Sequence, residues 1–439
     1  MNPEISQIIF SILFILAIFL FIKRMLLVRK IILLGKPFSP ENSKKDRIKN
    51  LLLIAFGQKK MFKKPTVAFL HLLVYAGFII INIELLEIVL DGILGTHRLF
   101  YSFAPNTYLF LINAFEVLAL GVIIACVVFL IRRNFISIPR LSSNDLKGWP
   151  NRDAHIILFA EIVLMLLFLK MNAADSLLQQ RNVSPYQEAA TGDFMISSLL
   201  HILMNSFSTS LLIATERTTW WMHILGILAF MNYLSRSKHL HIILAFPNSY
   251  FNSTRSSSTL QNMPAIQKEV YLSMNPGVVD TSSPETPSAF GAQDIQDLSW
   301  KNILDAYSCT ECGRCSNACP ATLTGKKLSP RKIMMATRDR AEEIGRTLSK
   351  NQPTESTSKT LLHDYISEEE LRACTTCQAC IEECPIGIRP MDIIVELRRY
   401  LVMEKSIAPA AWTSMFSNTE SNFAPWKFSP DQREDWNNK

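Results

Sequence analysis

This chain of 439 residues lacks the sequence signals of most soluble enzymes. It has no glycine-rich dinucleotide-binding fingerprint, no flavin motif and no residue pattern that suggests a catalytic triad. Its net charge of +7 is not gathered into a basic stripe with interleaved aromatic residues, which argues against nucleic acid as a partner. The basic leader of a secretory signal peptide is also missing, because Glu4 stands there and the positive charges follow the first apolar run.

The cysteines do not form a disulfide framework, which is typical of small exported domains. Eight of the nine cysteines fall into two tight groups. The ninth, Cys126, lies inside an apolar run and is expected to be membrane core. Cys-x-x-Cys spacing beside basic loops indicates reduced thiolates that hold a metal.

The first half of the chain is, in contrast, strongly apolar. The hydrophobic fraction is 49% overall and is concentrated in the first 245 residues. A helix needs about 20 apolar residues to cross a bilayer. Five runs are long enough, and the sequence therefore predicts a five-helix transmembrane bundle over residues 1–246. The predicted spans are residues 5–27, 67–90, 107–131, 154–171 and 220–245.

The charges of the loops predict the orientation of these spans. Between Lys23 and Lys64 there are thirteen Lys or Arg residues against two acids. Loops rich in Lys and Arg stay in the cytoplasm, so we expect an outside N-terminus and a cytoplasmic C-terminal part, in a bacterial inner membrane. A sixth apolar run, residues 194–214, is interrupted by polar residues. It is predicted to be an interfacial or re-entrant helix on the outer side.

The remaining chain divides by composition. Residues 247–298 are rich in Ser, Asn, Pro, Thr and Gly, which predicts a linker with one short ordered piece around 270–274. Ser299 is expected to cap a helix that leads into the first cysteine group. The aromatic residues of the tail, 406–439, lack a helical period, and we expect an extended segment that docks on a partner or on the preceding domain. Further helices are predicted at 330–344, 367–373 and 391–404.

The two cysteine groups have the same spacing. The first is Cys309, Cys312, Cys315 and Cys319, followed by Pro320, and the second is Cys374, Cys377, Cys380 and Cys384, followed by Pro385. Three cysteines at i, i+3 and i+6 can hold three irons of one cubane, and the fourth commonly binds the other cluster in two-cluster proteins. Zinc, the alternative, usually takes two separated pairs. The predicted ligand sets of two [4Fe–4S] clusters are Cys309, Cys312, Cys315 and Cys384, and Cys374, Cys377, Cys380 and Cys319.

The domain around these motifs, residues 299–405, is larger than a compact bacterial ferredoxin. Fifty-four residues separate Cys319 from Cys374, and the segment between them is predicted to be helical. It resembles the α-helical ferredoxin domain of succinate dehydrogenase iron–sulfur subunits and of the small iron–sulfur subunit of heterodisulfide reductase. The fold class expected for the whole chain is therefore all-α.

Histidines accompany the predicted spans. His71 lies near the inner end of the second span, His223 near the outer end of the last, and His239 and His241 near its inner end. On one continuous helix, His223 and His241 would share a face about 27 Å apart along the axis. Such histidines suit one or two b-type haems, although interfacial histidines also extend toward the lipid headgroups.

Five spans with histidines on the second and fifth resemble the cytochrome b subunit of respiratory nitrate reductase and the membrane subunit of heterodisulfide reductase. The resemblance implies that His71 with His241, or with His239, holds an inner haem, and that His223 holds an outer one. The family's fourth ligand falls near Ile81, which cannot bind iron. Other candidates for haem ligation are His97, His155 and His201.

The arrangement is similar to a fusion of the membrane cytochrome and the small iron–sulfur subunit of a heterodisulfide-reductase-like complex. The adjacent Cys-Cys motif of the catalytic subunit is absent. The resemblance therefore implies an oxidoreductase subunit that passes electrons between a cytoplasmic donor, on a flavoprotein or cysteine-rich partner, and the quinone pool.

Two further interpretations stay open. The carboxylates within the spans could serve proton uptake or could pair with neighbouring polar groups; they are Glu84, Glu87, Glu116 and Glu161. The alternative function is a membrane accessory or maturation factor that carries two ferredoxin motifs and no haem.

Overall fold

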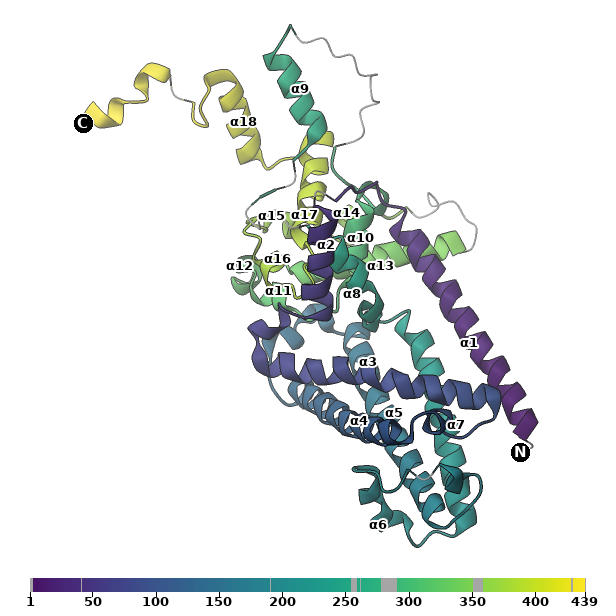
Figure 1. Ribbon diagram of the computed structural model, residues 1–439. Coiled ribbons are helices and arrows are strands. Elements are labelled where there is room, and N and C mark those ends of the chain that lie inside the picture. The colour runs from purple at the N-terminus through teal and green to yellow at the C-terminus, as the bar shows by residue number, and fades with distance from the viewer. Residues whose placement is uncertain are drawn as a thin grey trace.

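The computed structural model describes residues 3–40, 42–189, 191–253, 259–260, 262–277, 290–349, 358–427 and 429–438. Within these ranges the regular elements are helices, and no strand is formed. Long apolar helices occupy the N-terminal half, and a compact group of shorter helices follows, as Figure 1 shows. The predicted all-α fold is confirmed.

Five long helices build the N-terminal half. They are α1 (Pro3–Ile32), α3 (Pro65–Leu94), α4 (Pro105–Asn134), α5 (Trp149–Gln180) and α7 (Thr209–Leu234). Among the described residues, the first four of these are long and apolar enough to cross a membrane, and they coincide with the first four predicted spans. Proline stands in the first turn of α3, α4 and α5, where the missing backbone N–H costs no helical hydrogen bond.

These helices pack through large apolar side chains and small residues. Phe10 of α1 is buried and its ring lies 5.6 Å from that of Trp220 in α7. Gly92 of α3 allows this approach, because a Cβ atom there would stand 2.7 Å from the ring of Phe10. The ends of α3, α4, α5 and α7 at Leu94, Pro105, Gln180 and Thr209 meet one another through side-chain hydrogen bonds. They lie opposite the loops that contact the cysteine-bearing domain. We call this the far end of the bundle.

The fifth long helix differs from the predicted span at 220–245. α7 covers Thr209–Leu234, and a separate turn, Lys238–Leu240, follows the break. The side chain of Ser208 accepts a hydrogen bond at the start of α7, and that of Ser237 caps the next turn. Hydropathy is continuous across the break, but serine side chains that bind backbone N–H groups end one helix and begin another. The prediction of one helix over 220–245 is wrong.

This break also overturns the predicted alignment of two histidines. His223 lies in α7, whereas His241 is the first residue of a different helix, α8 (His241–Tyr250). The two residues therefore do not share one face of a continuous helix.

The segment 194–214 is not a single re-entrant helix either. It forms the turn η7 (Ser197–Leu200) and the short helix α6 (His201–Met204), and its last residues already belong to α7. Ser208 caps α7 and so divides the apolar run into two elements.

The cysteine-bearing domain is a cluster of short helices around one long one. Ser299 caps α10 through a capping box, as its sequence predicts. The predicted helices at 330–344, 367–373 and 391–404 are also observed. The elements are α10 (Trp300–Ser308), α11 (Arg314–Asn317), α12 (Pro320–Leu323), α13 (Pro330–Ser349), α14 (Leu361–Asp364), α15 (Glu368–Arg372), α16 (Ala379–Glu383) and α17 (Pro390–Arg399), which continues as the π-turn Tyr400–Glu404.

The core of this domain is continuous with the C-terminal end of α1. Ile31 is fully buried, and Gly345 of α13 lies so close that a Cβ atom there would stand 2.3 Å from its side chain. Arg24 forms an ion pair with Glu342 of α13 at 2.6 Å. The first long helix thus runs from the membrane bundle into the core of the cysteine-bearing domain.

The linker and the tail each contain a helix. The ordered piece expected around 270–274 is part of α9 (Pro264–Met274). The tail forms α18 (Ala410–Asn422) and is not extended as predicted. Trp412 and Phe416 lie four residues apart, which suits one helix face. Both α9 and α18 project away from the compact domain in Figure 1.

The connection between α1 and α3 contains two short helices before the 3-10 turn η2 (Met61–Lys63). They are α2 (Lys44–Asn50) and the π-helix η1 (Leu51–Phe56).

Candidate functional site

The two cysteine motifs lie in loops with the same backbone. The first cysteine loop is residues 309–315, and the second cysteine loop is residues 374–380. Left-handed backbone conformation costs a residue with a side chain about 1–2 kcal/mol. It occurs at matching positions of both loops, so the repeat extends from spacing to conformation. These positions are Glu311 and Gly313 in the first loop and Thr376 and Gln378 in the second.

The thiols gather in two groups that each join cysteines from both motifs. Burial raises the pKa of Cys309 to about 12, and the nearby thiols of Cys312 and Cys384 raise it as well. Neighbouring thiols act in the same way on the pKa of Cys315 and of Cys380. One group is therefore Cys309, Cys312, Cys315 and Cys384, and the other is Cys319, Cys374, Cys377 and Cys380.

These groups fit cubanes by their chemistry and spacing. In the described part of the chain, no three His, Cys, Asp or Glu side chains converge tightly enough to hold one metal ion. A four-iron cluster instead places each cysteine on a different iron. Backbone N–H groups also point at the sulfurs, with Ile388 N at 3.2 Å from Cys384 Sγ and Thr376 N at 3.4 Å from Cys374 Sγ. Such donors stabilise thiolate and cluster charge.

The first cysteine loop is held against loops that connect the long apolar helices. Arg140, between α4 and α5, donates to the backbone oxygen of Cys312 at 2.9 Å. Lys238, between α7 and α8, pairs with Glu311 at 2.5 Å, and Arg338 pairs with the same carboxylate at 2.8 Å. The first cysteine loop therefore lies directly against the loops that join the long apolar helices.

A buried ion pair secures the same contact. Arg331 of α13 is 1% exposed and pairs with Asp145, in the loop between α4 and α5, at 2.6 Å. Arg331 also donates to the backbone oxygen of Arg140 at 2.7 Å, and Ser329 donates to Asp145 at 2.9 Å. The guanidinium of Arg331 thus lies between the membrane half and the cysteine-bearing domain and forms hydrogen bonds to both.

Replacing Asp145 by Asn should loosen this docking, because it leaves the buried guanidinium of Arg331 without a counter-charge. We expect a loss of about 3–5 kcal/mol of stability, measured as a lower midpoint in denaturation of the purified protein in detergent. The matched control is Asp339→Asn, since Asp339 is an exposed partner of Arg338 at 3.6 Å. A control as unstable as the Asp145 variant would contradict this role.

The pH dependence of this contact follows from the same geometry. Burial opposes ionisation of Asp145, but hydrogen bonds from Arg331 and Ser143 outweigh it and hold its pKa below the ordinary value. A depressed pKa contributes stability that is present above the unfolded value, about 3.9, and is lost as pH falls through the folded value. The stability that the ion pair of Asp145 and Arg331 contributes to the contact should therefore be constant from neutral pH to about 4. It should decrease only below that pH.

The second cysteine loop and the α16 segment that follows it contact the membrane half more loosely and are more open to solvent. Cys377 is the exposed cysteine among the eight. Lys63, before α3, pairs with Glu382 at 2.7 Å on the surface. Asn248 of α8 donates to the backbone oxygen of Ile386 at 3.1 Å. The second loop is thus the more accessible of the two.

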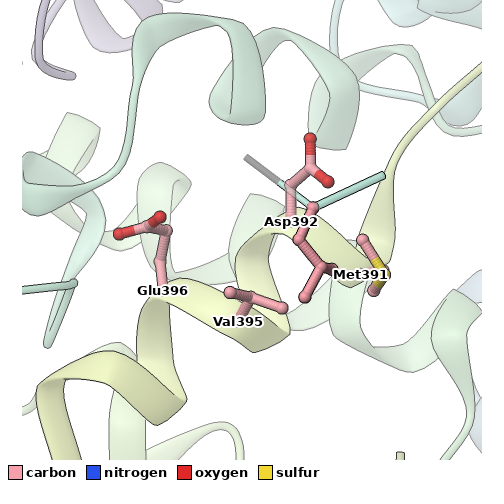
Figure 2. Close-up of a pocket in the computed structure, with 5 residues that line it drawn as sticks. Met391, Asp392, Val395 and Glu396 are labelled. Atoms are coloured by element: carbon pink, nitrogen blue, oxygen red, sulfur yellow. The ribbon is translucent and has the colours of Figure 1, made fainter. Parts of the chain in front are cut away.

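A shallow hollow on α17 lies beside the second loop, and Figure 2 shows the four α17 side chains that line it together with Leu260 of the linker. Met391, one of these, packs against Cys380. Gln378 of the second loop donates to the backbone oxygen of Thr259 at 3.4 Å. The linker therefore covers one side of the second cysteine loop. The α17 side chains are Met391, Asp392, Val395 and Glu396.

Three histidines gather at the end of the long apolar helices that faces the cysteine-bearing domain. The rings of His239 and His241 lie 5.5 Å apart, and both lie near His71. Nδ1 of His71 bonds to Gln58 at 3.1 Å, and Nδ1 of His241 bonds to the backbone oxygen of Lys238 at 3.1 Å. A metal-binding histidine typically holds one ring nitrogen in such a bond and offers the other. Nε2 of His239 is buried without a hydrogen-bond partner.

The other candidate histidines are dispersed. His223 is buried, and its Nδ1 bonds to the backbone oxygen of Leu164 at 2.9 Å, which suits a ligand. His97 lies 3.4 Å from Asp175, and Nε2 of His201 bonds to Ser176 at 2.7 Å. The remaining candidate, His155, has both ring nitrogens bonded, to Asn151 and Asn134.

A polar cluster at the far end of the bundle was only partly visible in the sequence. Glu84, Glu87 and Glu116 are visible in the sequence as acids within apolar runs. The arginine at the centre of the cluster, Arg98, lies outside the predicted spans and is 7% exposed. Asp175 lies in the part of α5 beyond the predicted 154–171. Only the longer helix brings it inside the bundle. We define the far-end cluster as Glu84, Glu87, Arg98, Tyr108, Glu116, Asn172, Asp175 and Glu216.

Comparison with known proteins bears on the cysteine-bearing domain first. Residues 305–388 match the family model of the 4Fe-4S dicluster domain. This range contains all eight clustered cysteines. No solved structure matches the chain.

Curated relatives cover more of the chain. A probable iron-sulfur-binding oxidoreductase, FadF, of Bacillus subtilis is 28% identical over 422 residues, which is 89% of this chain and 55% of the relative. The EtfAB:quinone oxidoreductase of Syntrophomonas wolfei is 26% identical over 417 residues, 89% of this chain and 54% of the relative. In the ferredoxin/F420H2-dependent CoB-CoM heterodisulfide reductase of Methanosarcina acetivorans, one of the subunits is 38% identical over 107 residues, 24% of this chain and 52% of the relative.

The chain therefore spans about half the length of the two relatives that it matches over most of its own residues. Its similarity to heterodisulfide reductase, expected from the sequence, is confirmed. The chain contains a 4Fe-4S dicluster domain and, among its described residues, four helices apolar enough to cross a membrane, and it is similar to iron–sulfur oxidoreductases and to subunits of heterodisulfide reductase.

Proposed function

We propose that this protein passes electrons between a cytoplasmic donor and the quinone pool, through two [4Fe–4S] clusters and b-type haem. The observation that carries this function is the docking of the first cysteine loop on the inner ends of the membrane helices by Arg140 and Lys238. Lys238 directly precedes His239 in the chain, so the cysteine loop and the inner histidines meet at one place. In this proposal the protein lies in the bacterial inner membrane with its N-terminus outside.

The two thiol groups are proposed as the ligand sets. Cys309, Cys312, Cys315 and Cys384 would hold the cluster nearer the membrane helices. Cys374, Cys377, Cys380 and Cys319 would hold the more exposed cluster, which receives electrons. Iron–sulfur clusters carry one electron at a time, and the surrounding donors and charges set their potentials. Exposure of Cys377 favours the second loop as the docking side for the donor.

Haem ligation is proposed for the inner histidines, with His71 opposite His241 or His239. His223 is the ligand proposed for a second, outer haem. Bound haem would supply one-electron transfer across the membrane. This chain's own part is to hold the imidazoles in place, through Gln58 for His71 and through the backbone of Lys238 for His241.

The donor is proposed to be a flavoprotein or a cysteine-rich iron–sulfur subunit. One relative is named for EtfAB and quinone, and that name supports an electron-transferring flavoprotein on one side and a quinone on the other. Since this chain spans about half of that relative, the catalytic site for the donor is proposed to lie on a partner.

Spectroscopy of the full chain purified in detergent tests this function. We expect electron paramagnetic resonance signals of two reduced [4Fe–4S] clusters and the absorption bands of reduced b-type haem. Addition of an oxidised quinone should then reoxidise both cofactors. Full cluster signals without haem bands would contradict the proposed electron transfer to the quinone pool. They would favour the alternative function, an accessory or maturation factor.

A further inference from the structure

The far-end cluster places many ionisable side chains in an otherwise apolar bundle. Arg98 lies at its centre and bonds to Asp175 at 2.5 Å, to Tyr108 at 2.8 Å and to Asn172 at 3.0 Å. Tyr108 in turn donates to Glu87 at 2.8 Å. Since each of these groups has a bonded partner, this half of the cluster is satisfied as a network.

Two further carboxylates of the cluster also have partners. Glu116 accepts bonds from the backbone nitrogens of Ile196 and Ser197, at 2.8 and 3.0 Å. Glu216 pairs with Arg217 at 2.5 Å and accepts a bond from Tyr186 at 2.7 Å. Both carboxylates therefore have polar partners inside the apolar bundle.

Glu84 differs from these groups. It is 3% exposed, and its Oε2 atom has no hydrogen-bond partner. An ionised carboxylate without a partner costs several kcal/mol in an apolar interior, and such a group neutralises instead. The burial of Glu84 and its unpartnered Oε2 atom therefore suit this carboxyl to carry a proton.

A small cavity of about 30 Å³ adjoins Glu84, and a polar cavity holds a water molecule once it exceeds about 10–15 Å³. Its lining leads toward the surface, because Asp91 and His97 are only half-buried at the end of α3 and just after it. The lining residues are Glu84, Glu87, Ile88, Asp91, His97, Arg98, Met171, Asp175, Glu216 and Trp220. Water here would join Glu84 to the outer surface.

We propose that Glu84 is the proton carrier of an uptake site at the far end, and that it hands protons to a quinone reduced there. This inference rests on the proposed function. A quinone takes two electrons and two protons and becomes a quinol. The donor is oxidised and supplies the electrons one at a time through the clusters, and each proton leaves the Glu84 carboxyl for a quinone oxygen. The carboxylate then takes a proton from the surface through the cavity.

The position of His223 connects this site to the electron path. It lies in α7 three residues after Trp220, which lines the cavity. The titratable groups near Glu84 come from four helices and one turn and would modulate its protonation. They are Glu87, Asp91, His97 and Arg98 from α3 and the turn after it, Tyr108 and Glu116 from α4, Asp175 from α5, and Glu216 from α7.

The test uses the full-length holoprotein in liposomes, with reduced viologen as donor and a short-chain quinone as acceptor. Glu84→Gln keeps the size of the side chain and removes its ionisable proton. We expect kcat for quinone reduction to fall at least tenfold with an unchanged KM. Reduction of ferricyanide, which takes up no proton, should stay unchanged. Glu84→Asp should keep part of the activity with a shifted pH profile.

The matched control is Glu188→Gln, since Glu188 is an exposed carboxylate at the same end of the bundle. If the wild-type protein reduces quinone and Glu84→Gln does so equally fast, the inference is overturned while the proposed function stands. If the wild-type protein reduces ferricyanide but no quinone, the proposed function itself fails. If Glu84→Gln loses its clusters, a second measurement tests the inference, namely the infrared difference spectrum between the oxidised and the reduced wild-type protein. We expect a carboxylic-acid band in this spectrum, and the band should shift in Glu84→Asp. If no such band is seen, the inference is overturned.

Discussion

Replacing Cys384 by Ser should remove the cluster of the first cysteine loop and leave the cluster of the second. The reason is that the thiol of Cys384 lies with Cys309 and Cys312, although Cys384 ends the second motif. Serine is a poor ligand for iron in a cubane, whose natural ligands are thiolates. We expect loss of about half of the iron and acid-labile sulfide, and of one of the two electron paramagnetic resonance signals.

The signals are assigned with variants inside each loop. Cys312→Ser defines the spectrum without the first cluster, and Cys377→Ser defines the spectrum without the second. Cys384→Ser should reproduce the former, and Cys319→Ser should reproduce the latter. Cys126→Ser is the matched control, since Cys126 lies in α4 away from both loops, and it should retain both signals. A Cys384 variant with the spectrum of Cys377→Ser would show that each motif binds its own cluster.

Replacing His71 by Ala should abolish the inner haem while both clusters remain. His71 is held by Gln58 and is close to both His239 and His241, so its loss removes one of two axial ligands at this place. We expect a fall in haem content of the purified protein, or a change to a high-spin spectrum if haem stays bound through one histidine. Quinone reduction through the clusters should fall at least a hundredfold, because the onward carrier is lost.

The matched control is His363→Ala, since His363 is exposed in the cysteine-bearing domain. Its haem content should equal that of the wild-type protein. Unchanged haem in the His71 variant, with loss of haem in His155→Ala, would instead assign the ligand to His155. A comparison of His239→Ala with His241→Ala then identifies the second ligand.

Local signals were predicted well from the sequence. Ser299 was expected to cap a helix, and the structure shows it in a capping box with Asn302. The helix expected at 330–344 is observed as Pro330–Ser349. In both cases the relevant interactions join residues a few positions apart, so the pattern of the chain contains them.

Errors arose where short polar residues interrupt apolar runs. Hydropathy alone joined residues 220–245 into one span, although Ser237 caps a separate turn. The same kind of error joined 194–214, which Ser208 divides. A window average cannot register one side chain that binds a backbone N–H group, yet that single bond decides where a helix begins.

The sequence by itself determined the chemistry of this protein: two repeated cysteine motifs typical of cubanes, and apolar runs long enough for a membrane. Spacing and hydropathy are properties of neighbouring residues, so the chain alone contains them. The grouping of Cys384 with Cys309 was expected from the repeated motif, and the thiols lie accordingly. Only the tertiary structure decided that Lys238 meets Glu311, and that Glu84 lies buried without a partner for one of its oxygens. These contacts join residues far apart in the chain, and they form only when whole helices pack.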